Sequence, residues 1–147
     1  ATGHRPPPTV TLWGSGSPRR EFLHVDDLAE ACVFVMENVD FDDLVTLRRQ
    51  ELGEDCPEAE NIRNTHVNIG RGRDLGIKEL AKLIRSIVGY KGRTVWDDSK
   101  PDGTPRKLLD VSRLKFLGWK PRIELQEGIE ATYNWYLASQ AREGGKD

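Results

Sequence analysis

One segment near the start of the chain restricts the fold more than any other, residues 13–27 with the sequence WGSGSPRREFLHVDD. Its glycines and its proline form a turn between two expected short strands, at residues 9–13 and 21–25. A helix is expected to begin directly afterwards, with Asp26 or Asp27 as its N-cap. The segment therefore predicts a β-hairpin that leads into a helix.

The same turn carries two adjacent arginines, Arg19 and Arg20. Glycine lets a backbone approach a ligand closely, and a guanidinium presents a planar fork of donors that matches phosphate oxygens. A second cationic turn lies at residues 100–107, KPDGTPRK, where two prolines and a glycine restrict the backbone. We call it the lysine-proline loop, and we expect the two turns to converge on one diphosphate.

Apolar periodicity predicts the other elements. Glu30 follows Asp27 at capping-box spacing, and the first helix has one apolar face made of Leu28, Ala31, Cys32, Val35 and Met36. Further along, we expect strands at residues 65–69 and 93–96 and helices at residues 77–88, 112–117 and 125–140. This pattern indicates an α/β fold with α+β character, built from short strands and about four helices.

Three segments read as peripheral. Residues 1–8 contain three consecutive prolines and are expected to be extended, and residues 141–147 form a polar, glycine-rich tail expected to be flexible. Residues 40–64 form a variable acidic connection, with a helix expected near residues 42–50.

Composition restricts the class of protein. The chain has 147 residues, of which 37% are hydrophobic, so it has the size of one domain and can bury a core. Its net charge of -2 gives no field that would gather nucleic acid. No apolar run is long enough to span a membrane, and no signal peptide is evident, so we expect a cytoplasmic protein. Cys32 and Cys56 lack the spacing of metal ligands, and we predict neither a metal site nor a disulfide.

The two turns, together with VNIGRG at residues 67–72, VGYKG at 88–92, LGW at 117–119 and YNWY at 133–136, closely resemble the C-terminal part of the GDP-L-fucose synthase family. These enzymes are extended short-chain dehydrogenases/reductases. The pattern Arg-x-Phe-x-His-Val-x-Asp is shared by related sugar-nucleotide epimerases and dehydratases, and the lysine-proline loop narrows the choice to the fucose synthase branch. The resemblance implies a GDP-sugar-binding domain over residues 1–147 without the N-terminal Rossmann core.

The family pattern also implies functional residues. Arg20 and Lys107 match the family's two diphosphate contacts, and Trp13 matches a tryptophan that lines the substrate pocket. Arg71 and Arg106 could border the nucleotide. We expect His24 to have a packing role, because no nucleophile or carboxylate shares a catalytic spacing with it. Two further tryptophans, Trp119 and Trp135, are expected to lie in the core.

The family reaction is 3,5-epimerisation of GDP-4-keto-6-deoxy-D-mannose followed by NADPH-dependent 4-reduction. The resemblance places its acid-base cysteine and histidine, its serine-tyrosine-lysine group and its NADP site upstream of Ala1. His4 does not match the catalytic histidine, and the chain has no Tyr-x-x-x-Lys. We therefore predict no catalytic residue here, no NADP on this part and no turnover by the chain alone. Its expected partners are the missing Rossmann half, the GDP-sugar and a second copy, which would form a homodimer.

Three other interpretations stay open. The chain could be the C-terminal domain of another NAD(P)-dependent nucleotide-sugar epimerase or dehydratase. It could also be a non-enzymatic nucleotide-binding module or a purely structural interaction module. Balanced charge and the lack of interleaved aromatic residues disfavour nucleic acid as the ligand.

Overall fold

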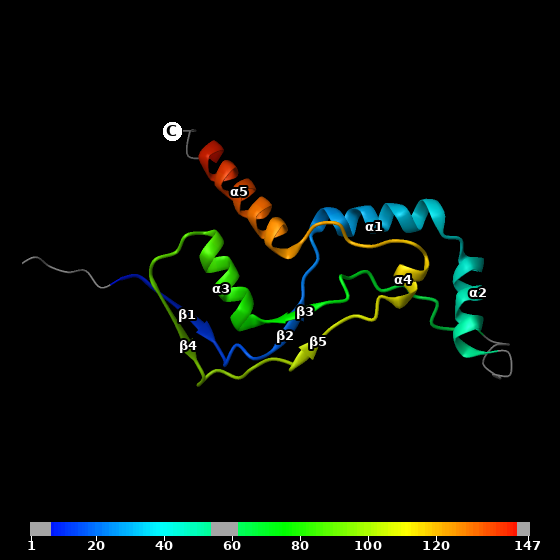
Figure 1. The fold of residues 1–147 in the computed structure, drawn as a ribbon, viewed down its shortest axis with the longest axis horizontal. Coiled ribbons are helices and arrows are strands. Elements are labelled where there is room, and N and C mark those ends of the chain that lie inside the picture. The colour runs from blue at the N-terminus through cyan, green and yellow to red at the C-terminus, as the bar shows by residue number, and fades with distance from the viewer. Residues whose placement is uncertain (1–6, 54–61, 144–147) are drawn as a thin grey trace, which may run out of the picture. The chain divides into compact units, whose positions relative to one another are not determined.

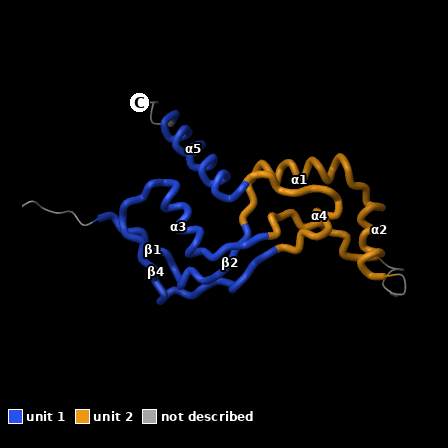
Figure 2. Tube along the Cα trace, in the orientation of Figure 1, with its two compact units in different colours: residues 1–21, 73–108, 124–147 blue, residues 22–72, 109–123 orange. Residues whose placement is uncertain are grey.

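The computed structural model describes residues 7–53 and 62–143. Cys56, most of the leading segment 1–8 and residues 144–147 of the tail lie outside this part. The chain divides into two compact units (Figure 2). Unit 1 comes from Ala1–Glu21, Arg73–Leu108 and Glu124–Asp147, as far as these are described, and unit 2 comes from Phe22–Gly72 and Leu109–Ile123.

Unit 1 holds two small sheets (Figure 1). The first pairs β1 (Thr9–Trp13) in parallel with β4 (Arg93–Asp97), from Thr9 opposite Arg93 to Trp13 opposite Asp97. The second has the order β3-β2-β5. In it β2 (Arg19–Glu21) runs antiparallel to β3 (Asp74–Gly76) and parallel to β5 (Arg106–Lys107). The prediction of an α/β fold with short strands is confirmed.

The predicted hairpin at the glycine turn is wrong. The turn is present, with Gly14 and Gly16 at φ of +78° and +73°, but β1 and β2 enter different sheets. Gly16 explains the close packing here, because a Cβ on it would lie 2.5 Å from the Trp96 ring. The second strand also begins earlier than expected, at Arg19 rather than Glu21.

Two helices complete unit 1. The helix α3 (Ile77–Ile87) confirms the expected amphipathic helix, and Gly89 follows it at φ +66°, a conformation that glycine adopts without strain. The last helix, α5 (Leu125–Glu143), contacts α3 and runs slightly further than predicted. Trp135 is exposed, so its predicted core position is wrong; Tyr136 and Leu137 of the expected apolar stripe are exposed as well.

Unit 2 is built on α1 (Val25–Asn38), whose N-cap differs from the prediction. The cap is His24, whose Nδ1 accepts a hydrogen bond from the Asp26 N–H at 3.2 Å. Asp27 is only 2% exposed and instead accepts the backbone N–H groups of Arg122 and Ile123 at 3.1 and 3.0 Å. A buried carboxylate needs such donors, so Asp27 ties a distant segment to the helix.

The core of unit 2 contains Ala31, Leu114 and Trp119, which are all buried. Ala31 comes from α1, and Leu114 comes from α4 (Ser112–Phe116), a helix at the expected place that is followed by Gly118 at φ +101°. The predicted core position of Trp119 is confirmed. On the predicted apolar face of α1, in contrast, Leu28, Cys32 and Met36 are exposed.

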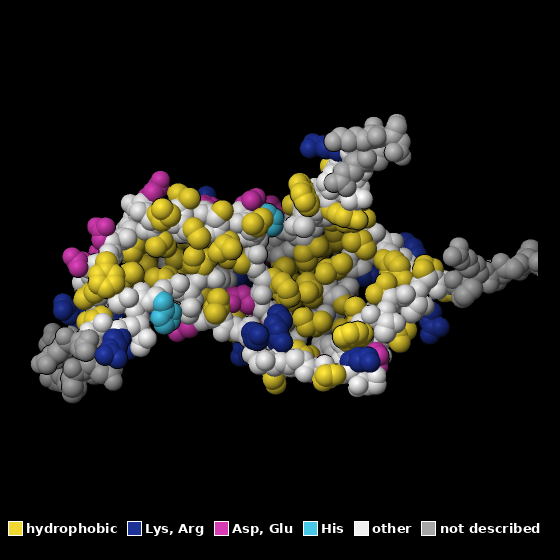
Figure 3. Space-filling model, turned by 180° about the vertical axis from the view of Figure 1, so that it is seen from behind, with side chains coloured by type: hydrophobic (Ala, Val, Ile, Leu, Met, Phe, Trp, Pro, Cys, Tyr) yellow, Lys and Arg dark blue, Asp and Glu magenta, His cyan; other side chains and the backbone are white. Residues whose placement is uncertain are grey.

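The acidic connection contains the expected helix as α2 (Phe41–Leu52), capped by Asp40. The predicted strand at residues 65–69 is wrong, because this segment has no ladder partner and is irregular. Among the described residues, no helix has both the length and the apolarity needed to cross a membrane. Seen from behind, both units carry large hydrophobic areas on their surfaces (Figure 3).

Candidate functional site

The structure places Arg20 and Lys107 directly opposite each other on β2 and β5. Neighbouring strands lie roughly 4.8 Å apart, so the two side chains leave the sheet as near neighbours on one face. We call them the cationic pair. Within the described ranges, neither residue has a carboxylate partner, and the one recorded bond of the Arg20 guanidinium runs to the Arg19 carbonyl at 2.7 Å.

The opposite face of the same sheet is neutralised. Successive side chains of a strand alternate between faces, so Arg19 and Arg106 point away from the cationic pair. Both bind the carboxylate of Asp74 on β3: Arg19 Nε lies 2.9 Å from Oδ1, and Arg106 Nε bonds Oδ2. We call these three residues the Asp74 bridge. The bond from Arg106, helped by the one from Arg19, holds the pKa of Asp74 below its usual value.

The lysine-proline loop is attached to the glycine turn through Asp102. Its carboxylate accepts the Ser15 N–H at 2.9 Å and the Ser15 hydroxyl at 2.6 Å. Hydrogen bonds from the Ser15 hydroxyl and then from its N–H lower the pKa of Asp102, so the attachment is ionised at neutral pH. Gly14 lies so close to this carboxylate that it has no room for a Cβ.

The same loop contacts the other predicted site residues. Gly103 of the loop lies against Arg20, since a Cβ on this glycine would lie 3.1 Å from Arg20 Nη2. Lys100 lies over the indole of Trp13, with Nζ 5.7 Å from the ring centroid. Trp13 is 73% exposed at the end of β1, so most of its ring is open to a stacking ligand.

The remaining predicted residues have structural partners. Arg106, expected at the border of the nucleotide, belongs to the Asp74 bridge. Arg71 lies in unit 2, where its Nη1 donates to the Ile123 carbonyl at 2.7 Å. The structure therefore brings Trp13 and Arg20 against the loop that carries Lys107 in unit 1, and it does not bring Arg71 into that unit.

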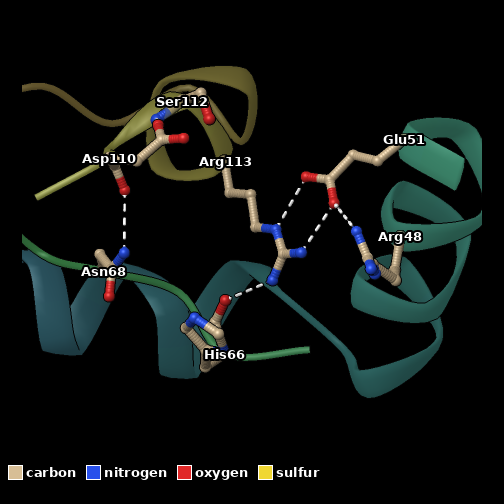
Figure 4. Close-up of a pocket in the computed structure, with 7 residues that line it drawn as sticks. All are labelled: Arg48, Glu51, His66, Asn68, Asp110, Ser112 and Arg113. Carbon is tan, nitrogen blue, oxygen red and sulfur yellow. Dashed lines mark hydrogen bonds and ion pairs between the residues drawn. The ribbon is translucent and has the colours of Figure 1, made fainter. Parts of the chain in front are cut away.

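Unit 2 has a polar cavity of about 450 Å³ (Figure 4). Its lining residues are Arg48, Glu51, His66, Asn68, Asp110, Ser112 and Arg113. Figure 4 shows the Arg113 guanidinium between Glu51 and the His66 backbone: it donates to both Glu51 oxygens, at 2.8 and 2.7 Å, and to the His66 carbonyl at 2.6 Å. Because Arg113 and Glu51 neutralise each other, we interpret the cavity as part of a structural network and unit 1 as the stronger ligand site.

The chemistry available in unit 1 is anion binding. A guanidinium forms bidentate, charge-assisted hydrogen bonds with phosphate oxygens, and an adjacent ammonium supplies a second positive charge. Two neighbouring phosphate groups match two neighbouring cations. In the described ranges, no group of histidine, cysteine, aspartate and glutamate side chains has the geometry of a metal site.

Comparison with known proteins agrees with this chemistry. Residues 1–46 match the NAD dependent epimerase/dehydratase family. GDP-L-fucose synthase of Escherichia coli (strain K12) is 50% identical over 135 residues, which are 92% of this chain and 38% of that protein. The chain thus spans about a third of the length of the curated relatives that it matches.

Two solved structures from Campylobacter jejuni are each 42% identical to the chain. A GDP-6-OMe-4-keto-L-xylo-heptose reductase covers 89% of this chain and 34% of its own, with a TM-score of 0.74. MlghC, a GDP-mannoheptose C4 reductase with NADP bound, covers 88% of this chain and 35% of its own, with a TM-score of 0.70. The resemblance to GDP-L-fucose synthases is therefore confirmed, and the chain corresponds to a fragment of their fold.

Proposed function

We propose that this chain forms the GDP-sugar-binding part of a GDP-L-fucose synthase and that the cationic pair binds the diphosphate. The observation that carries the proposal is the register of β2 and β5, which places Arg20 beside Lys107 although they are far apart in sequence. Similarity to GDP-L-fucose synthase of Escherichia coli supplies the identity of the ligand.

Each predicted site residue has a distinct role in this proposal. Arg20 binds phosphate oxygens with its planar fork, and Lys107 neutralises the second phosphate as a point charge. Trp13 stacks on the sugar or the base with its exposed indole face. No residue of the chain is assigned to proton or hydride transfer.

The complete enzyme would convert GDP-4-keto-6-deoxy-D-mannose into GDP-L-fucose by 3,5-epimerisation and 4-reduction. The reduction takes a hydride from NADPH. We assign the binding of NADPH to the part of the relatives that this chain does not cover. That part and a second subunit would cover exposed apolar side chains such as Val33, Met36 and Trp135. We propose a homodimer that acts in the cytoplasm.

Calorimetric titration with GDP tests the proposal. Arg20→Ala and Lys107→Ala should each weaken GDP binding by roughly 10-fold or more, because each removes a charge-assisted contact. Arg93→Ala is a matched control, since Arg93 is an exposed cation of unit 1 on β4, outside the β3-β2-β5 sheet. UDP binding should be weaker than GDP binding. Affinity for GDP that is unchanged in both site variants would refute the assignment.

The Campylobacter jejuni structures, whose names specify GDP-heptoses, support an alternative substrate for the complete enzyme, a GDP-keto-heptose. The diphosphate contacts would be the same, because they lie on the nucleotide and not on the sugar. Turnover of a GDP-keto-heptose faster than GDP-4-keto-6-deoxy-D-mannose, measured with the complete enzyme, would favour this alternative.

A further inference from the structure

The cationic pair depends on a very short ladder between β2 and β5. The strand β5 has only two residues, and its ladder with β2 has only two residue pairs. Two like charges side by side repel one another, so the repulsion between Arg20 and Lys107 destabilises the pairing of β2 with β5. So short a ladder needs another interaction to keep its register.

The bridge supplies that interaction across all three strands. Asp74 lies on β3, Arg19 on the central strand and Arg106 on β5, and the Asp74 side chain is only 5% exposed. A shift of a strand by one residue moves every side chain to the other face. While Asp74 holds Arg106 on its own face, the next residue, Lys107, must lie on the face of Arg20.

We propose that Asp74 is a positioning residue for the diphosphate site, because its bonds to Arg19 and Arg106 fix the β2–β5 register that pairs Arg20 with Lys107. This inference rests on the proposed function, and it assigns Arg106 to the bridge rather than to the nucleotide. Asp74 does not touch the ligand itself. It acts from the opposite face of the sheet.

The direction in which Asp74→Asn changes the affinity for GDP separates a positioning role from a simple electrostatic effect. Asp74→Asn removes a negative charge near the anion site, so charge alone predicts tighter binding of an anion. Positioning predicts weaker binding, because an amide cannot bond both guanidinium groups as a carboxylate does. We expect the affinity for GDP, measured by calorimetry at fixed ionic strength, to fall roughly 10-fold.

Three further variants sharpen the test. Asp98→Asn is the matched control, because Asp98 is an exposed carboxylate just before the same loop and bonds no arginine of the described ranges. It should not weaken binding. Asp74→Glu keeps the charge and should restore part of the affinity. In a Lys107→Ala background, Asp74→Asn should reduce the affinity for GDP less than it does in the native chain. General destabilisation of the unit would reduce the affinity equally in both backgrounds.

A second measurement needs no ligand. The Arg19 N–H donates to the Pro105 carbonyl at 2.8 Å, so its hydrogen exchange reports the pairing of β2 with the loop before β5. The Val88 N–H, bonded to Ile84 at 2.9 Å at the end of α3, reports the folding of the same unit. Asp74→Asn should speed exchange at Arg19 and leave Val88 protected.

The two measurements distinguish the two hypotheses. If native protein fails to bind GDP, the proposed function fails, and hydrogen exchange alone decides the role of the bridge. If Asp74→Asn also loses protection at Val88, Arg106→Gln replaces it, because this exposed residue breaks the bridge from β5. Unchanged protection at Arg19, or GDP affinity equal to or tighter than that of the native chain, would overturn the inference.

Discussion

Replacement of Glu51 by glutamine should remove a pH-dependent part of the stability of unit 2. The Glu51 carboxylate receives two hydrogen bonds from Arg113, at 2.8 and 2.7 Å, and one from Arg48 at 3.1 Å. Its bond with Arg113 is the main reason that its pKa falls from 4.5 to about 2. At 1.36 kcal/mol per unit, this shift corresponds to at most about 3.4 kcal/mol. Because the Glu51 side chain is 31% exposed, solvent screening reduces it to about 1–2 kcal/mol.

The sign follows from the direction of the shift. A carboxyl group with a lower pKa in the folded state stabilises that state above its unfolded pKa, near 4.5, and loses this contribution as the pH falls through about 2. The difference in free energy of unfolding between native protein and Glu51→Gln should therefore be about 1–2 kcal/mol at pH 7. It should decrease as the pH falls below about 4.5 and nearly vanish at pH 2.

Urea titration followed by ¹⁵N NMR can measure this difference in one unit at a time. The indole N–H signal of Trp119 reports unit 2, and that of Trp96 reports unit 1. Glu37→Gln is the matched control, because Glu37 is an exposed carboxylate of α1 whose side chain has no ion pair or hydrogen bond within residues 7–53 and 62–143. Equal stability of native protein and Glu51→Gln at pH 7, or a difference that does not change with pH, would refute the reasoning.

Three more substitutions test features of the fold and the site. Asp27→Ala leaves two backbone N–H groups without their acceptor and should destabilise unit 2 by about 3 kcal/mol, visible at the Trp119 indole; a loss below about 1 kcal/mol would contradict it. Gly16→Ala should destabilise unit 1 by about 1–3 kcal/mol at the Trp96 indole, because its Cβ would meet that ring at φ +73°, and unchanged stability would argue against this packing. Asp102→Asn removes the ionised acceptor of both Ser15 bonds and should weaken GDP binding in calorimetry by roughly 3–10-fold, whereas native affinity would show that the loop needs no such attachment.

Helices that carry their own periodicity were predictable from the sequence. The helices α3, α4 and α5 begin and end close to their expected bounds, because apolar spacing and the glycines after α3 and α4 are local signals. The cap of α1 was not. Asp27 is of a residue type that often caps helices, but its carboxylate accepts the N–H groups of Arg122 and Ile123, which lie far along the chain. His24 caps the helix in its place.

Strand pairing was beyond local reasoning. Residues 9–13 and 21–25 were predicted to be the arms of a hairpin. The observed strands, residues 9–13 and 19–21, instead pair with residues 93–97 and 74–76, and no signal near the turn specifies these partners. The strand β3 was missed because its three residues, DLG, have no strand pattern. Asp74 was therefore missed as well, although an acidic residue between two arginine-rich segments could have suggested it.

Of the candidate site, the residue types could be predicted and their surroundings could not. Arg20, Lys107 and Trp13 were named from the glycine turn, the lysine-proline loop and a family resemblance. Their binding roles stay predictions. The alternation that separates Arg20 from Arg19, and Lys107 from Arg106, follows only from the ladder register.

The connection between the glycine turn and the lysine-proline loop has a consequence during protein synthesis. Ser15 and Asp102 are separated by 87 residues, and the whole described part of unit 2 before Gly72 is made between them. A ribosome adds roughly 5–20 residues per second, so roughly 4–17 s pass between the synthesis of β1 and the synthesis of β4 and the lysine-proline loop. During that interval the unpaired strand edge and the Trp13 indole are open to chaperones and to other nascent chains.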